Sequence, residues 1–144
     1  MEPEMEPPRQ NELLRSIGTQ LLDHVPEEWR EIRLAYHAVR KHKAASVEVR
    51  KADGSEEEVG ITAAIYLDLE KLREGMYRKG KGTWFLLKYT IVSPGRFSVD
   101  FDYESEPDFF GVPSNGGDFL DDLRHFPRDD ENIPAWLAQK ISGN

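Results

Sequence analysis

Apolar and polar residues alternate without interruption from Phe97 to Glu104. Successive side chains of a strand point to opposite faces, so this alternation predicts a strand that is buried on one side and polar on the other. The apolar face would carry Phe97, Val99, Phe101 and Tyr103, and the polar face Ser98, Asp100, Asp102 and Glu104. A second apolar-rich run, Trp84–Val92, ends at Ser93-Pro94-Gly95, which is typical of a turn. The two runs therefore predict an antiparallel hairpin.

Further elements follow from spacing. Apolar residues recur at helical intervals from Asn11 to Val25, where Pro26 ends the pattern, and again from Ile61 to Met76, with Thr62 as the expected N-cap. Between these helices we expect three strands, and after the hairpin two helices; the expected ranges are 32–38, 47–49, a segment ending near 59, 118–125 and 133–141. The order α-β-β-β-α-β-β-α-α predicts an α+β fold: a single domain with a mostly antiparallel sheet of about five strands and helices packed on one face.

Length and composition agree with one domain. The chain has 144 residues, of which 38% are hydrophobic, enough for a single core. Residues 1–8 are acidic and rich in proline with little to bury, so we expect a disordered lead-in there and the domain in residues 9–144. The chain has no cysteine, no long apolar run and no signal-peptide pattern. We therefore expect a cytoplasmic protein without disulfides or membrane contact.

Charge is the strongest indication of a partner. The formal net charge is −8, and residues 98–131 contain eleven acidic residues against two basic ones. Nucleic acid is disfavoured as a direct ligand because phosphate binding depends on Lys and Arg. A cationic protein surface is favoured, since opposite fields speed association. The predicted partner-binding residues are Asp100, Asp102, Glu104, Glu106, Asp108, Phe109, Phe110, Asp118, Asp121 and Asp122.

Two other groups of residues have open interpretations. Phe109 and Phe110 lie in an acidic loop, either packed beneath it or exposed as apolar anchors. The basic stretch from Lys71 to Arg96 reads as the solvated face of a helix and its linker, and is the next candidate for an interface.

Catalytic chemistry has little support in the sequence. Asp100 and Asp102 would lie about 7 Å apart on one strand face, where they could bind Mg²⁺ or Ca²⁺ or act as acid and base. However, the chain lacks a glycine-rich phosphate loop, a histidine ligand motif and a nucleophile elbow. We assign no catalytic, cofactor-binding or metal-binding residue. A small metal-dependent or acid/base enzyme using the two aspartates, and a general protein-interaction module, stay as alternatives.

Three segments together resemble the YezG-like (EsaG-like) immunity protein family of bacterial polymorphic toxin systems. They are LLRSIGTQLLDHVPEEWREIRL at 13–34, the hairpin WFLLKYTIVSPGRFSVDFDY at 84–103 and the tail FPRDDENIPAWLAQKI at 126–141. The resemblance implies an antitoxin that binds and silences a cognate secreted toxin domain, often a nuclease. An acidic surface would suit this role by occluding a cationic substrate groove. The activity of the toxin is open and includes NAD degradation and deamination, and the oligomeric state is unknown.

Overall fold

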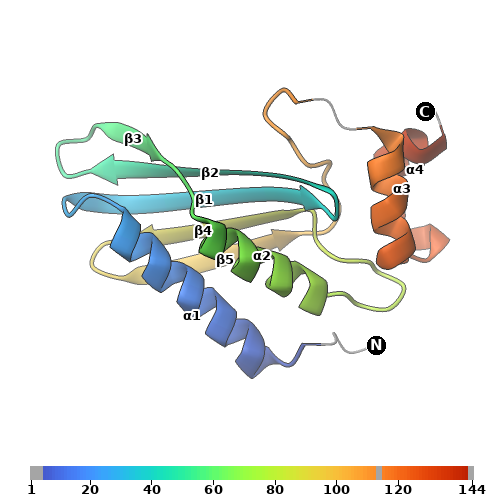
Figure 1. Cartoon of the computed structure of the whole chain (residues 1–144), viewed down its shortest axis with the longest axis horizontal. Helices are drawn as coiled ribbons and strands as arrows, with labels where there is room; N and C mark the ends of the chain where they lie inside the picture. The colour runs from blue at the N-terminus through green and yellow to red at the C-terminus, as the bar shows by residue number, and fades with distance from the viewer. Residues whose placement is uncertain (1–4, 113–114, 143–144) are drawn as a thin grey trace.

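The computed structural model describes residues 5–112 and 115–142 and has the predicted α+β fold in a single domain. Five antiparallel strands form one sheet in the order β3-β2-β1-β4-β5. The strands are β1 (Trp29–Val39), β2 (His42–Lys51), β3 (Glu56–Val59), β4 (Leu86–Val92) and β5 (Arg96–Asp102). Helices α1 (Pro7–His24) and α2 (Ala63–Gly75) lie side by side on one face of the sheet (Figure 1).

The remaining helices lie at one end of the sheet. Helix α3 (Gly116–His125), the short 3-10 helix η1 (Asp130–Asn132) and α4 (Ala135–Ser142) follow the long loop after β5 (Figure 1). They adjoin the turn between β1 and β2 and bury a second apolar cluster there. This cluster contains Val39, Phe85, Phe109, Phe119 and Leu137.

The main core lies between the sheet and the first two helices. In α1 the buried side chains Leu13, Leu14, Ile17 and Leu21 recur at the helical spacing predicted for residues 11–25, whereas Leu22, in the same range, is 42% exposed. In α2 the hydroxyl of Thr62 accepts a hydrogen bond from the Ile65 amide at 3.2 Å, which confirms the predicted N-cap. Every second residue of β1 is buried against the helices, from Ile32 to Ala38. The sequence periods therefore set which face of each element is buried.

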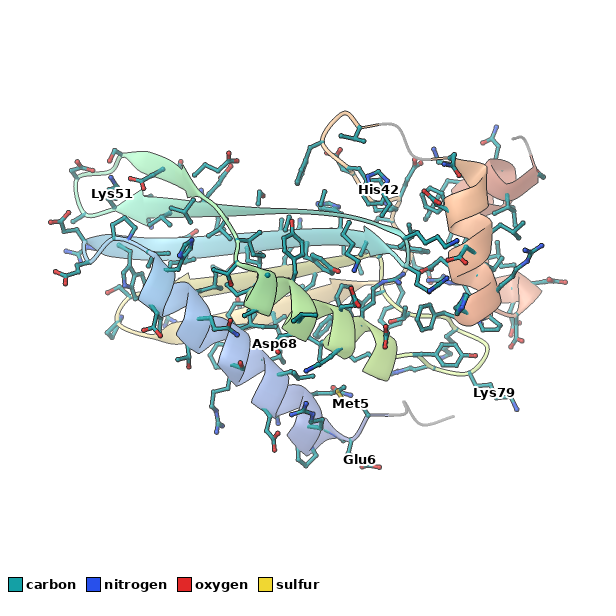
Figure 2. The ribbon with its side chains drawn as sticks, viewed as in Figure 1. Met5, Glu6, His42, Lys51, Asp68 and Lys79 are labelled. Atoms are coloured by element: carbon teal, nitrogen blue, oxygen red, sulfur yellow. The ribbon has the colours of Figure 1, made fainter. Side chains whose placement is uncertain are left out.

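The boundary of the predicted lead-in needs a correction. Residues 1–4 lie outside the described part, but Met5 already packs against the main core and α1 begins at Pro7, inside the range 1–8. The Met5 amide donates to the Gly75 carbonyl at 2.9 Å, and the Met5 side chain lies beside the end of α2 (Figure 2). Proline favours the first turn of a helix, where its missing N–H costs nothing, so Pro7 starts α1 rather than extending the lead-in.

We expect Met5→Ala to lower the free energy of unfolding by about 1 kcal/mol, because part of an apolar side chain leaves the core. The measurement is urea denaturation followed by circular dichroism. Leu67→Ala is the matched control, since Leu67 is 57% exposed on α2 and should change stability by less than about 0.5 kcal/mol. Equal effects of the two substitutions would show that Met5 contributes no packing.

Candidate functional site

The face of the sheet turned away from α1 and α2 is built from several segments of the chain (Figure 1). Cross-strand register places polar residues in rows across this face, which we call the open face. One row runs Glu58, Glu48, Arg33, Thr90 and Ser98, and the next runs Ser46, Ala35, Lys88 and Asp100. The third row runs Ala44, His37, Leu86 and Asp102.

Three of the predicted partner-binding residues meet at one side of the open face. Asp100, Asp102 and Glu104 line a shallow groove of about 490 Å³ together with Leu86 and Lys88. We call it the carboxylate groove. Asp100 and Glu104 are exposed, and Lys88 lies directly opposite Asp100 on the neighbouring strand. The predicted strand alternation is confirmed here, since it places Asp100 and Asp102 on the same face of the sheet.

Asp102 also stabilises the turn that follows β5. One of its carboxylate oxygens accepts hydrogen bonds from the amides of Glu104 and Ser105, both at 2.9 Å. Partial burial by itself raises the pKa of Asp102, but hydrogen bonds from Ser105 and Glu104 outweigh it, and the net pKa is lowered. The carboxylate is thus ionised and holds the turn that carries Glu104.

The loop after β5 brings an aromatic residue to the open face. Phe109 is buried, and its ring stacks on the His42 ring with centroids 4.0 Å apart. Phe110 is 49% exposed, and its ring forms a T-shaped contact with the His37 ring, with centroids 5.4 Å apart. Of the two alternatives, packing beneath the loop and exposure to solvent, the first therefore holds for Phe109 and the second for Phe110. Phe109 packs beneath the loop, which removes it from the predicted binding surface, whereas the Phe110 ring is accessible to solvent.

His37 fixes this loop to the sheet. Its Nδ1 accepts a hydrogen bond from the Asp108 amide at 3.0 Å, which requires that nitrogen to be unprotonated. Burial is the main cause that lowers the pKa of His37, opposed by the charge of Asp108 and aided by that of Lys88. A neutral imidazole therefore holds Asp108 and Phe110 over the open face.

The acids of α3 do not join this surface. Asp122 is only 5% exposed and forms a two-point ion pair with Arg73, with distances of 2.7 and 3.0 Å. Asp121 pairs with Arg40 in the turn between β1 and β2 at 2.9 Å. The prediction that both carboxylates face a partner is wrong for Asp122, because it falls three residues after the buried Phe119 and so shares its inward face.

Two further predicted partner-binding residues, Glu106 and Asp118, form contacts within the protein. Glu106 is exposed and forms an ion pair with Lys140 of α4 at 3.1 Å. Asp118 is half-buried in the first turn of α3, where its amide donates to the side chain of the N-cap Asn115 at 2.9 Å. An acidic residue at this position is favoured by the helix dipole. The predicted site therefore divides into a cluster on β5 and its loop, and a set of acids that secures α3 and α4.

The buried partner Arg73 departs from the sequence-based interpretation. It belongs to the basic stretch taken as a solvated helix face, yet it is 3% exposed. Its Nε donates to the carbonyl of Trp84 at 2.7 Å, and its guanidinium lies over the ring of Phe126. Asp122 also accepts from the Arg40 amide at 2.8 Å. This network joins α2, α3 and the turn after β1. Arg73 and Asp122 are 49 residues apart, so no local sequence pattern predicts that they pair.

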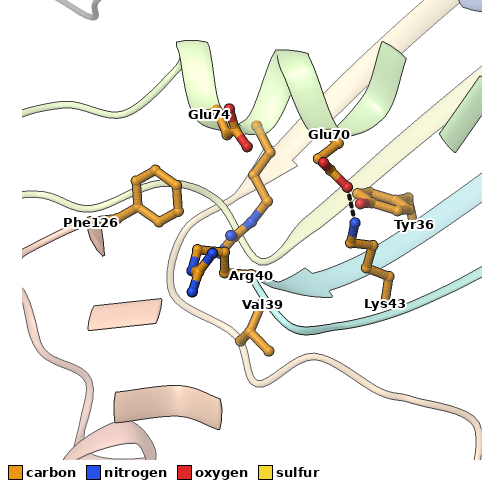
Figure 3. Close-up of a pocket in the computed structure, with 8 residues that line it drawn as sticks. Tyr36, Val39, Arg40, Lys43, Glu70, Glu74 and Phe126 are labelled. Carbon is orange, nitrogen blue, oxygen red and sulfur yellow. Dashed lines mark hydrogen bonds and ion pairs between the residues drawn. The ribbon is translucent and has the colours of Figure 1, made fainter. Parts of the chain in front are cut away.

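A small pocket of about 110 Å³ lies beside this network. Figure 3 shows Lys43 pointing at Glu70, with which it forms an ion pair; Val39, Arg40 and Phe126 also line the pocket. Burial is the main cause that lowers the pKa of Lys43. The three cations that line the pocket already have carboxylate partners: Lys43 has Glu70, Arg40 has Asp121 and Arg73 has Asp122. The pocket is therefore best explained as part of the structural network.

Further acids, which were not among the predicted partner-binding residues, lie on the other side of the open face. The Arg33 guanidinium donates hydrogen bonds to the carboxylates of Glu31, Glu48 and Glu56, and these bonds, the one to Glu31 first, raise the pKa of Arg33. Glu58 is exposed at the edge of a groove of about 580 Å³ that Phe110 also lines. The strand period places Glu56 and Glu58 on one face, but the sequence Glu-Glu-Glu-Val has no apolar alternation that would show which face is exposed.

The open face also bears on the metal alternative. Within residues 5–112 and 115–142, no group of three or more acidic or histidine side chains is arranged to hold a metal ion. The cation nearest to Asp100 in the register is Lys88.

Acidification should release the loop from the sheet. A histidine with a lowered pKa makes the folded state bind fewer protons than the unfolded state, so its contribution to stability is present at neutral pH and is lost as pH falls below about 6.5. We expect hydrogen exchange of the Asp108 amide, followed by NMR, to speed up between pH 7 and pH 5 beyond the intrinsic trend. In His37→Asn, whose amide oxygen can accept the same bond without titrating, this excess should disappear. An unchanged profile in both proteins would contradict the role of His37.

Comparison of the chain with protein-family models and with curated proteins found no match. In the described part of the chain, every helix is too short or too polar to cross a membrane. The function is therefore inferred from the open face and the residues it gathers.

Proposed function

We propose that this protein is an immunity protein, which binds a cognate secreted toxin domain in the cytoplasm and neutralises it without chemistry of its own. The observation that supports this best is the carboxylate groove on an open sheet face, whose other side carries the exposed Phe110. The resemblance of the hairpin at residues 84–103 to immunity proteins supports the same reading. A nuclease is the favoured target.

The physical basis is competition for a cationic groove. A nuclease binds phosphates through Lys and Arg, so its substrate groove attracts carboxylates as well. Asp100 and Glu104 are exposed and form no ion pair within the described residues, and their charge is therefore available to such a groove. Phe110 adds apolar surface that is desolvated on contact, and aromatic residues of this kind contribute much of the energy of protein interfaces.

The proposal is tested by co-expression with the C-terminal domain of a large secreted protein encoded next to this gene. We expect the two chains to copurify, and the toxin domain to lose its activity in the complex. A basic domain of an unrelated toxin, expressed in the same way, controls for nonspecific charge attraction. Failure to copurify when both chains are soluble, or turnover of a substrate by the purified protein alone, would contradict the proposal.

A further inference from the structure

Strand β5 ends the sheet on one side. It pairs with β4 along all seven residues from Arg96 to Asp102. Among residues 5–112 and 115–142, no other segment pairs with its outer side. An unpaired edge of this length, about 23 Å, is a template for another strand.

The backbone groups that point outward can be identified from one hydrogen bond. The Phe85 amide donates to the Asp102 carbonyl at 2.8 Å, so the backbone of Asp102 faces β4. Backbone groups alternate in direction along an antiparallel strand. The N–H and C=O groups of Phe97, Val99 and Phe101 therefore point to the free edge.

The side chains of this edge are complementary to themselves. In an antiparallel pair of two copies centred on Val99, Arg96 lies opposite Asp102 and Phe97 lies opposite Phe101 of the other copy. Asp100 then lies opposite Ser98, which keeps the aspartates of the two copies from facing each other directly. Opposite charges and aromatic pairs stabilise cross-strand contacts, and like charges destabilise them. The outward backbone groups of residues 97, 99 and 101 meet in this register as hydrogen-bonded pairs.

An exposed aromatic residue marks the same edge. Phe97 is 56% exposed, although its ring stacks on Tyr89 with centroids 5.7 Å apart. In the antiparallel pair, the Phe97 ring is covered by Phe101 of the second copy. The pairing therefore explains why the chain places a large apolar side chain at an open strand edge.

We infer that two copies of this chain associate through β5 into a symmetric dimer with one continuous ten-stranded sheet, twice the five strands of one copy. The partner of this edge is thus a second copy, and the inference does not depend on the proposed function. Since strand addition keeps the two faces of a sheet distinct, the carboxylate grooves of the two copies come together on a common open face.

The test uses two opposite substitutions at one exposed position. Ser98→Asp places an aspartate opposite Asp100 twice in the dimer, and Ser98→Lys places a lysine there twice. From the usual range for cross-strand pairs, we expect the first to raise the dimer dissociation constant about 2- to 30-fold and the second to lower it by a similar factor. Sedimentation equilibrium of the full chain measures both, and circular dichroism verifies that the variants are folded.

A third variant tests the backbone contacts. Val99→Pro removes an N–H that points to the free edge, so the β4–β5 hydrogen bonds are retained and the dimer is lost. A wild-type protein that is monomeric up to about 1 mM would overturn the inference. So would a dimer whose dissociation constant is shifted equally, or not at all, by the two substitutions at Ser98, because its interface would then lie elsewhere.

Discussion

Replacing Arg73 with alanine should lower the free energy of unfolding by about 3–5 kcal/mol, a large fraction of the stability of a domain of this size. The substitution leaves the carboxylate of Asp122 buried without its cation and removes the hydrogen bond to the Trp84 carbonyl. An uncompensated buried charge is costly because it has lost its hydration. Since Asp122 belongs to α3, we expect the C-terminal helices to loosen first, which hydrogen exchange would detect.

Two controls separate the ion pair from general disruption. The double variant Arg73→Met with Asp122→Leu removes both charges and should regain part of the lost stability, because no buried charge is left alone, although the Arg40 amide and the Trp84 carbonyl lose their side-chain partners. Arg124→Ala removes an exposed arginine of α3 and should change stability by less than about 0.5 kcal/mol. A loss below about 1 kcal/mol in Arg73→Ala would show that the pair does not secure α3.

Reversing two charges of the carboxylate groove should abolish tight toxin binding while leaving the fold intact. Asp100→Lys with Glu104→Lys changes two exposed residues, each at a cost of about 0.5 kcal/mol or less in stability. Close charge pairs at interfaces contribute about 1.5–7 kcal/mol, so losing one pair weakens binding at least tenfold. Asp121 and Asp122 are unsuitable for this experiment because their ion pairs hold α3.

The matched control reverses two carboxylates on the other side of the molecule. Glu12→Lys with Asp23→Lys gives the same net charge from exposed positions on α1. Added salt should slow association of the wild type and of this control more than that of the groove variant, since steering is screened beyond about 8 Å at physiological ionic strength. Equal binding by the two double variants would mean that only net charge matters, and that the groove is a solvated surface.

The fold could be predicted because its signals are local. The alternation around Phe97 and the helical spacing from Ile65 to Met76 are each carried by residues close in sequence, and both appear in the structure. Thr62 was predictable as an N-cap for the same reason. The start of α1 was placed too late because acidic and proline-rich composition outweighed the helix-starting role of Pro7.

The site was predictable only in part because its assembly depends on distant pairs. Strand alternation placed Asp100 and Asp102 correctly on the open face. Asp122, in contrast, is buried against Arg73, and Phe109 is buried in a cluster with residues distant in sequence, such as Val39. A run of acidic residues shows net charge, but whether each carboxylate faces solvent or an internal cation is decided by tertiary packing.

The most direct test of the proposed function is growth of cells that express the neighbouring toxin domain. We expect the wild-type protein and the Glu12→Lys, Asp23→Lys variant to restore growth, and the Asp100→Lys, Glu104→Lys variant to fail at equal soluble abundance. Rescue by the groove variant as complete as that by the wild type would contradict binding through the carboxylate groove. Absence of rescue by the soluble wild-type protein would contradict the immunity function itself.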